Sequence, residues 1–205
     1  MGAIELRRVP KQQRSREKYD RVLAVASQLI GERGNDAVSM REIADGAALP
    51  ISTVYQYFPD KNAILWTLLA SHFERLEQLW LAELAEVKHP AALTDTSLRL
   101  FDNFVELCRS EAVFARLWRC AQANTVLMEL DQALNQRIAT ALVQRLEQLG
   151  VKQDSERTWT SVYMMASLSS SALQLAFNDE TRCEAILAEF RELIRSQMTP
   201  FGPAS

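Results

Sequence analysis

Cysteine and histidine are scarce in this chain of 205 residues, which has three of the first and two of the second. Cys108, Cys120 and Cys183 are odd in number and widely spaced, which excludes a disulfide framework and a C-x-x-C site. A reducing compartment, the cytoplasm, is therefore the expected location. His72 and His89 belong to no cluster with metal-ligand spacing, so we predict neither a metal site nor a cofactor.

Sequence patterns of several other classes of protein are missing as well. The charged N-terminus has no apolar segment of the kind found in signal peptides, so none is expected. No stretch alternates as a half-buried strand does, and the helical periodicity predicts an all-α bundle. We find no nucleophile–base pairing and no phosphate-binding loop, so an enzyme is not expected; an all-α enzyme is kept as an alternative.

Charge of either sign is missing from one long stretch, residues 158–178. Its 21 residues are long enough to span a bilayer, but five serines and two threonines make it too polar, so no membrane partner is expected. A helix without charge on any side is buried on most faces. We therefore predict that it packs on its own bundle and, with the next helix around residues 186–198, on a second copy of the chain. Three serines would allow close approach: Ser167, Ser170 and Ser171. A purely intramolecular central helix is the alternative.

Basic residues are not in excess overall, since the formal net charge is −3. This balance argues against a generally basic nucleic-acid binder, but the charges are unevenly distributed. Residues 1–21 hold seven basic and three acidic side chains, a balance of +4, whereas residues 67–205 hold 13 basic and 18 acidic, a balance of −5. We expect residues 1–15 to form a basic arm that contacts phosphates or the minor groove, with a disordered, solvated terminus as the alternative.

The most informative stretch runs from residue 39 to residue 61, S-M-R-E-I-A-D-G-A-A-L-P-I-S-T-V-Y-Q-Y-F-P-D-K. Ser39 followed by Glu42 is a capping box, so a short helix is predicted to begin directly after Ser39. Pro50 cannot continue that helix and suits the first turn of a second one. Asp60 then caps the next helix, so the stretch predicts two short helices joined by a tight turn.

The second of these helices lacks charge on the side opposite its apolar residues. The helical spacing places four residues on the buried side: Ile51, Val54, Tyr55 and Phe58. Four others occupy the opposite side: Ser52, Thr53, Gln56 and Tyr57. Neutral side chains that form hydrogen bonds suit a helix that reads base edges in the major groove. Arg41 and Lys61, at helix starts, are expected to hold phosphates. The alternative is an ordinary helical hairpin inside an all-α core.

Three segments carry a family resemblance: R-V-L-A-V-A-S-Q-L-I-G-E-R-G from Arg21, V-S-M-R-E-I-A from Val38, and S-T-V-Y-Q-Y-F-P-D-K-N-A-I-L from Ser52. Together they resemble the N-terminal domain of the TetR family of bacterial transcription regulators, over about residues 16–65. Several residues fall where the family expects them: Gly34, Ile43, Ala44, Thr53, Tyr55, Tyr57, Phe58 and Lys61.

The chain departs from the family pattern at two positions of the turn. Ala48 stands where the family usually has glycine, and its Cβ is expected to disfavour a positive φ there. Pro50 stands where the family usually has serine, so the second helix is expected to lack its usual side-chain cap. Neither change disturbs the spacing of the apolar residues.

The resemblance implies a three-helix helix-turn-helix domain over residues 16–62 and a helical domain over residues 63–205 that binds a ligand and dimerises. It implies a homodimer, joined through its last two long helices, that binds a near-palindromic operator on double-stranded DNA, usually as a repressor. A small apolar or amphipathic effector would release it. The resemblance also aligns Ile51 with a position that faces the DNA groove, so we expect this residue to be partly exposed. The expected DNA-binding residues are Arg41, Ile51, Ser52, Thr53, Tyr55, Gln56, Tyr57 and Lys61.

The C-terminal part of the chain is rich in large, adaptable side chains. Those expected to line a ligand pocket are Phe101, Phe104, Trp118, Met128, Trp159 and Tyr163. Aromatic residues and methionines at helical spacing usually form part of a core, so it is the resemblance that favours a cavity. The alternative is a constitutive DNA-binding dimer whose helical body only dimerises.

Overall fold

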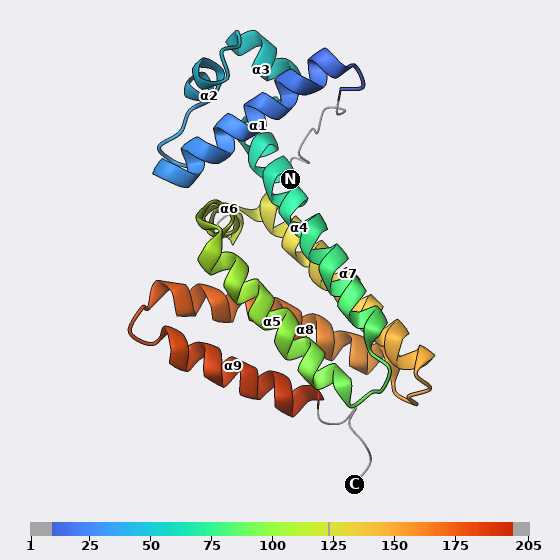
Figure 1. The fold of residues 1–205 in the computed structure, drawn as a ribbon. Helices are drawn as coiled ribbons and strands as arrows, with labels where there is room; N and C mark the ends of the chain where they lie inside the picture. The colour runs from blue at the N-terminus through green and yellow to red at the C-terminus, as the bar shows by residue number, and fades with distance from the viewer. Residues whose placement is uncertain (1–9, 123, 199–205) are drawn as a thin grey trace. The chain divides into compact units, whose positions relative to one another are not determined.

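The computed structural model describes residues 10–122 and 124–198. Within these ranges the chain forms nine helices and no strand, which confirms the predicted all-α fold (Figure 1). The first four helices are α1 (Gln13–Arg33), α2 (Met40–Gly46), α3 (Ile51–Tyr57) and α4 (Lys61–Glu86). The others are α5 (Ala92–Ser110), α6 (Ala112–Gln122), α7 (Thr125–Gln148), α8 (Ser155–Asn178) and α9 (Cys183–Met198).

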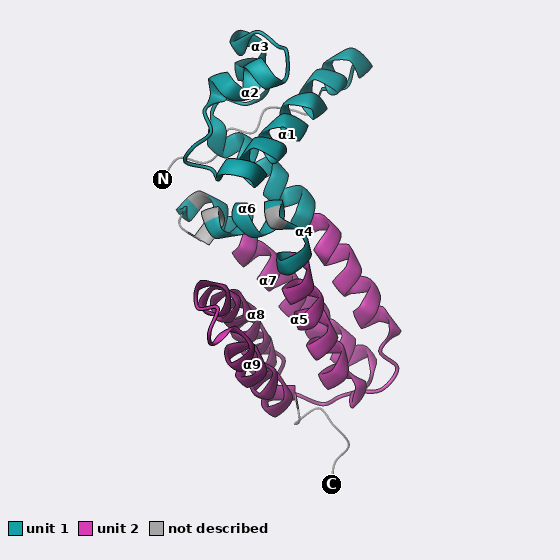
Figure 2. Ribbon diagram, turned by 60° about the vertical axis from the view of Figure 1, so that its left-hand side comes forward, with its two compact units in different colours: residues 1–73, 108–130 teal, residues 74–107, 131–205 magenta. Residues whose placement is uncertain are grey.

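Contacts divide the chain into two compact units, which Figure 2 draws in different colours. The first unit comprises the chain up to residue 73 and residues 108–130, so it holds α1, α2, α3, the first half of α4, and α6. The second comprises residues 74–107 and the chain from residue 131, with most of α5 and α7 and all of α8 and α9. The expected boundary after residue 62 stays a prediction, although α6, far along the chain, packs against α1.

Local capping chemistry sets several helix ends. Gly34 follows α1 with a φ of 81°, and Gly150 follows α7 with a φ of 75°; glycine adopts this left-handed conformation without a Cβ clash. At the start of α4, the Asp60 carboxylate accepts a hydrogen bond from the N–H of Ala63 at 2.8 Å. The positions of these helix ends are therefore determined by residues that are close together in the sequence.

The basic N-terminal arm is shorter than predicted. α1 begins at Gln13, so residues 13–15 are helical, because the run after Pro10 contains good helix formers and no glycine. Residues 1–9 lie outside the described residues. The basic side chains near the start of α1 are all exposed: Lys11, Arg14, Arg16, Lys18 and Arg21.

Close approach of helices builds the core of the first unit. A Cβ placed on Gly46 of α2 would lie 2.7 Å from Cγ1 of Val25 in α1. A Cβ on Gly31 of α1 would lie 2.6 Å from Cγ2 of Val113 in α6. Carbon atoms do not approach this closely without displacement, so glycine lets α1 pack against both helices. The buried face of α1 is formed by Tyr19, Val22, Ala26 and Ile30.

A buried polar cluster joins α7 to α8 in the second unit. The Ser170 hydroxyl donates to the Asp131 carboxylate, with both oxygens at 3.2 Å, and the Asn135 amide donates to the same carboxylate at 3.4 Å. Ser170 therefore serves close packing within its own bundle, which is one of the two kinds of contact expected for this helix. Ser167 is half-buried, and Ser171 is exposed.

α8 and α9 pack against each other and lie side by side in both views (Figures 1 and 2). Their apolar residues are not all covered: Met164, Leu168 and Leu175 of α8 and Leu193 of α9 are exposed. A shallow, largely apolar groove between the two helices includes Leu175 and Leu193. Over the described part of the chain, no helix has both the length and the hydropathy that a membrane span requires.

Candidate nucleic-acid interface

A tight turn centred on Ala48 joins α2 to α3. The N–H of Ala48 donates to the carbonyl of Asp45 at 3.1 Å, and the N–H of Leu49 donates to the carbonyl of Ala44 at 3.0 Å, which is the pattern of a Schellman motif. This motif needs a left-handed residue, and Ala48 supplies it with a φ of 51°. The turn therefore keeps a positive φ although alanine disfavours it, and its hydrogen bonds hold Ala48 in that conformation at a cost of about 1–2 kcal/mol.

Pro50 lies one residue before α3, and not in its first turn as predicted. Its ψ of 138° is extended, and its carbonyl accepts hydrogen bonds from the N–H groups of Thr53 at 2.8 Å and Val54 at 3.3 Å. No side chain caps the helix, as the missing family serine predicts. The fixed φ of proline and its carbonyl thus begin α3 without a side-chain cap.

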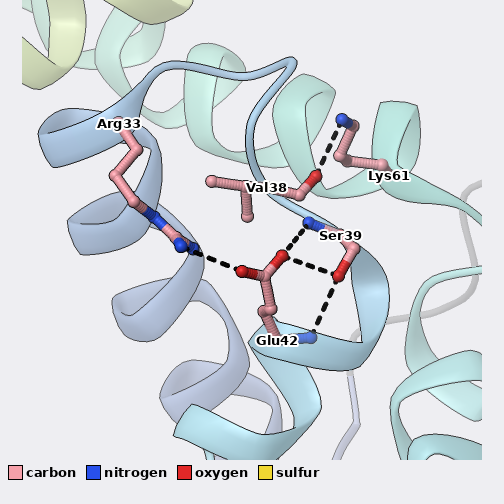
Figure 3. A network of polar contacts seen from close by, with 5 residues as sticks. All are labelled: Arg33, Val38, Ser39, Glu42 and Lys61. Carbon is pink, nitrogen blue, oxygen red and sulfur yellow. Dashed lines mark hydrogen bonds and ion pairs between the residues drawn. The ribbon is translucent and has the colours of Figure 1, made fainter.

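The capping box at the start of α2 also ties that helix to α1 (Figure 3). Glu42 accepts hydrogen bonds from the Ser39 N–H at 2.8 Å and the Ser39 hydroxyl at 2.7 Å, while its own N–H donates to that hydroxyl at 3.2 Å. The Arg33 guanidinium donates to the other carboxylate oxygen at 2.9 Å. These bonds, those of Ser39 above all, lower the pKa of Glu42 from 4.5 to about 2.

Lys61 is placed differently from the prediction that it holds a phosphate. Its ammonium donates to the carbonyl of Val38 at 2.9 Å (Figure 3). It also donates to the carbonyl of Asn35 at 2.7 Å, and the side chain is half-buried. Both carbonyls belong to the segment between α1 and α2. Lys61 thus fastens the start of α4 to that segment, and a phosphate contact of this residue stays a prediction.

Aromatic packing fixes α3 in the first unit. Phe58, directly after α3, is buried and stacks on Tyr19 of α1 with ring centroids 4.7 Å apart. Tyr57 is half-buried and meets the edge of the Tyr19 ring at 6.0 Å. Burial raises the pKa of Tyr19, and a hydrogen bond with Thr67 opposes this rise. Together with the fully buried Val54, these rings hold the orientation of a helix only seven residues long.

The outer face of α3 is uncharged and open. Ser52 and Gln56 are exposed and Thr53 is half-buried. Ile51 is 37% exposed and Tyr55 is 45% exposed. The periodicity is therefore wrong to place Ile51 and Tyr55 on the buried side, because so short a helix contacts its neighbours along one narrow edge. The exposure of Ile51 is compatible with the groove-facing position that the resemblance implies, which stays a prediction. On α2, Arg41 is also exposed.

A cavity of about 90 Å³ lies within the second unit, lined by residues of α4, α5, α7, α8 and α9. Its wall is almost entirely apolar and includes Trp80, Phe101, Phe104, Met165, Phe190 and Met198. Two of the six predicted pocket residues, Phe101 and Phe104, are among them. Trp80 is not among the predicted pocket residues, because nothing in the spacing of apolar residues distinguishes a cavity wall from a core.

The other four predicted pocket residues do not line this cavity. Trp118 is buried in the first unit, because α6 packs on α1. Met128, at the start of α7, also belongs to the first unit. Trp159 stacks on Tyr163 at 5.1 Å and donates its indole N–H to the Thr140 hydroxyl at 3.0 Å. A ligand-binding role for these four residues stays a prediction with no support from this cavity, whereas Phe101 and Phe104 line it.

Two short helices, joined by a tight turn and packed on a third helix, with an open uncharged face on the second, form a helix-turn-helix unit. A family model described as bacterial regulatory proteins of the tetR family matches residues 22–66. A second, described as a tetracyclin repressor-like C-terminal domain, matches residues 91–201, more than half of the chain. The chain therefore belongs to the TetR family of bacterial regulatory proteins.

Relatives among characterised proteins match over a short stretch of the chain. The chain is 37% identical over 62 residues to the HTH-type transcriptional repressor KstR of Rhodococcus jostii and 36% identical over 62 residues to KstR of Mycobacterium tuberculosis. Each match covers 30% of this chain. It covers 29% of the first relative and 28% of the second, so the aligned part is less than a third of either relative.

Solved structures share the fold over nearly the whole chain. A TetR-family regulator from Streptomyces coelicolor is 22% identical with a TM-score of 0.65, covering 90% of this chain and 99% of its own. A regulator from Pectobacterium atrosepticum is 16% identical with a TM-score of 0.72, covering 94% and 99%. RolR in complex with resorcinol is 20% identical with a TM-score of 0.63, covering 94% and 96%.

Proposed function

We propose that the protein is a homodimeric transcriptional repressor that binds a near-palindromic operator and releases it when a small molecule binds. The observation that carries this proposal is the outer face of α3. Ser52 and Gln56 are exposed side by side with no charged neighbour on the helix, while Val54 and Phe58 anchor the opposite edge. Hydroxyl and amide groups on a rigid helix are suited to base edges, and glutamine pairs with adenine through two hydrogen bonds.

Exposed cations near this helix supply the attraction to phosphates. Arg41 on α2 and the basic residues at the start of α1 are exposed in the same unit. Phosphate contacts position a protein on DNA, whereas base contacts select the sequence. We assign Arg41 to the first role and Gln56 to the second, with Ser52, Thr53 and Tyr55 beside it.

The dimer is proposed to form through α8 and α9. Met164, Leu168 and Leu175 are spaced at four and seven residues, so they lie on one side of α8, and all three are exposed. Leu193 extends this apolar face onto α9. The cores of dimer interfaces are depleted in charge and rich in apolar side chains, as this face is. Two joined heads would place their α3 helices one helical turn of DNA apart, about 34–36 Å.

The cavity of the second unit is the proposed effector site. Two structural neighbours were solved in complex with small molecules: RolR with resorcinol, and the multidrug binding protein EbrR with imidazole. Both ligands are small ring compounds, which supports a compact effector for this chain. An effector releases DNA only if it binds the releasing conformation better, typically by about 1–3 kcal/mol.

The small size of the cavity favours a second candidate function. Ligand pockets usually measure about 300–1,000 Å³, well above the 90 Å³ found here. A constitutive DNA-binding dimer, whose body only dimerises, needs no larger space. The two candidates differ in one property, which is whether any compound both binds the body and releases DNA.

Selection of bound sequences from random DNA tests the proposal directly. We expect enrichment of a near-palindrome, bound by two chains, and a lack of any enriched sequence would refute DNA readout. A thermal-shift screen with small ring compounds, followed by gel shift on the selected site, then separates the two candidates. A compound that raises the melting temperature and also releases DNA supports the effector-controlled repressor. Compounds that raise it without release support the constitutive dimer.

A further inference from the structure

The indole of Trp80 is the one polar group on the cavity wall that is buried without a partner among the described residues. Trp80 is 7% exposed, lines the cavity, and meets the Phe104 ring edge-to-face with centroids 6.2 Å apart. Its Nε1–H is fully covered and has no hydrogen-bond acceptor within the described ranges. Buried donors are almost always paired in folded proteins, so an exception on a cavity wall needs an explanation.

Another indole of the same unit shows the usual arrangement. The Nε1–H of Trp159 donates to the Thr140 hydroxyl at 3.0 Å, although Trp159 is less buried than Trp80. A tryptophan indole offers one donor and no acceptor. Only an oxygen or nitrogen acceptor can therefore satisfy Trp80, and the cavity that Trp80 lines is a space that a second molecule can enter.

The rest of the wall limits the chemistry of that molecule. Among the described residues, no lysine, arginine, histidine, aspartate or glutamate lines the cavity. Two serines do, Ser97 and Ser169, and the Ser169 hydroxyl already donates to the carbonyl of Ala166 at 2.6 Å. A charged guest would lose its hydration without compensation in such a site. The guest that fits is neutral and mostly apolar.

We infer that Trp80 is the hydrogen-bond donor of the effector site, and that the effector is a compact, neutral, mostly apolar compound carrying an acceptor oxygen such as a ketone. This inference rests on the proposed effector-controlled function. Because the indole nitrogen is covered and the cavity is small, side chains that line the cavity must move when the effector binds. Met165 and Met198 line it, and their unbranched side chains change conformation at low cost.

Two probes of nearly equal shape test the inference: acetophenone, and α-methylstyrene, in which a C=CH₂ group replaces the C=O. Both are titrated into the full-length protein with ¹⁵N-labelled tryptophan indoles. Because the chain has four tryptophans, Trp80→Phe assigns the Trp80 signal by its loss. We expect acetophenone, and not α-methylstyrene, to move that indole proton downfield. We also expect Trp80→Phe to lower the ratio of ketone affinity to alkene affinity about tenfold, the effect of one hydrogen bond.

Trp159→Phe is the matched control, because its indole N–H already has a partner, and it should leave the affinity ratio unchanged. An affinity ratio unaffected by Trp80→Phe, an indole signal that responds equally to both probes, or no binding of either probe would overturn the inference. If Trp80→Phe does not fold, replacing the other three tryptophans one at a time assigns the signal, and the ketone-specific shift decides. The titrations use no DNA, so a protein that binds the ketone but never releases its operator would contradict only the regulatory proposal.

Discussion

Glu42 connects α1 and α2 through a single carboxylate that accepts hydrogen bonds from Ser39 and Arg33. In the folded protein its pKa is about 2, below the ordinary 4.5. Between these two values the unfolded chain binds a proton that the folded chain does not. The stability contributed by Glu42 is therefore fully present above about pH 4.5 and is lost as the pH falls toward 2.

Replacing this carboxylate should flatten the acid side of the stability profile. Glu42→Gln can still bond to the N-cap residue but cannot titrate, so the free energy of unfolding should fall less steeply below pH 4.5 than in the parent protein. Urea unfolding at a series of pH values measures this. Arg33→Met is the control: it removes the guanidinium but keeps the Ser39 bonds that lower the pKa most, so its profile should stay close to the parent. Parallel profiles for Glu42→Gln and the parent would refute the assignment.

Gln56 and Arg41 should affect DNA binding in different ways. Gln56→Ala should weaken the selected operator by about 1–3 kcal/mol, roughly 5- to 150-fold, and leave random DNA nearly unchanged. Arg41→Ala should weaken both DNAs and reduce the salt dependence by about one counterion. Titrations at several salt concentrations measure both effects. Equal loss on both DNAs for Gln56→Ala would remove its role as a reader. Lys61 is a poor control, because its substitution also breaks two internal hydrogen bonds.

At the scale of the element, the turn between α2 and α3 contains a residue with a strained backbone conformation. Ala48 has a φ of 51°, in which its Cβ crowds the backbone, whereas glycine has no such clash. Ala48→Gly should therefore raise the free energy of unfolding by about 1 kcal/mol and leave DNA affinity unchanged. Denaturant unfolding at one fixed protein concentration measures it. Ala47→Gly is the matched control: Ala47 is buried with a φ of −78°, so glycine there should destabilise. Destabilisation by Ala48→Gly would show that the turn is not strained.

The sequence predicts helix ends well because local chemistry determines them. Ser39 with Glu42, Gly34 and Asp60 each complete hydrogen bonds or a backbone conformation with residues nearby in the chain. The buried edge of α3 is different, since it depends on where α1 and α2 lie. The exposure of Tyr55 therefore does not follow from its spacing.

The cavity was only partly predictable for a similar reason. Phe101 and Trp118 look equivalent in the sequence, since both are large apolar residues at helical spacing. The first lines the cavity, and the second is buried in the other unit, because α6 packs against α1 across some eighty residues of chain. The indole N–H of Trp80 shows no sequence signal at all, because only tertiary packing decides whether a donor finds an acceptor.

At the scale of the whole molecule, the exposed leucines of α8 should control assembly. Leu168→Glu places a charge within the proposed interface and should give a monomer at micromolar concentration that binds the selected operator far more weakly. Light scattering and gel shift measure the two properties. Leu79→Glu on α4 is the matched control, because Leu79 and Leu168 are both 44% exposed. It should remain dimeric, and a dimeric Leu168→Glu protein would place the interface elsewhere.

The close approach of α1 and α6 constrains how this protein can vary over time. Gly31 and Val113 are separated by 82 positions, yet any side chain at the first must occupy space already filled by the second. A larger residue at position 31 therefore requires Val113 to shift or to become smaller, whereas a smaller residue at position 113 requires no change of Gly31. Substitutions at these two positions are therefore coupled in one direction, in evolution as in engineering: while valine occupies position 113, glycine is favoured at position 31, and a larger residue at position 31 calls for a smaller one at position 113 beforehand.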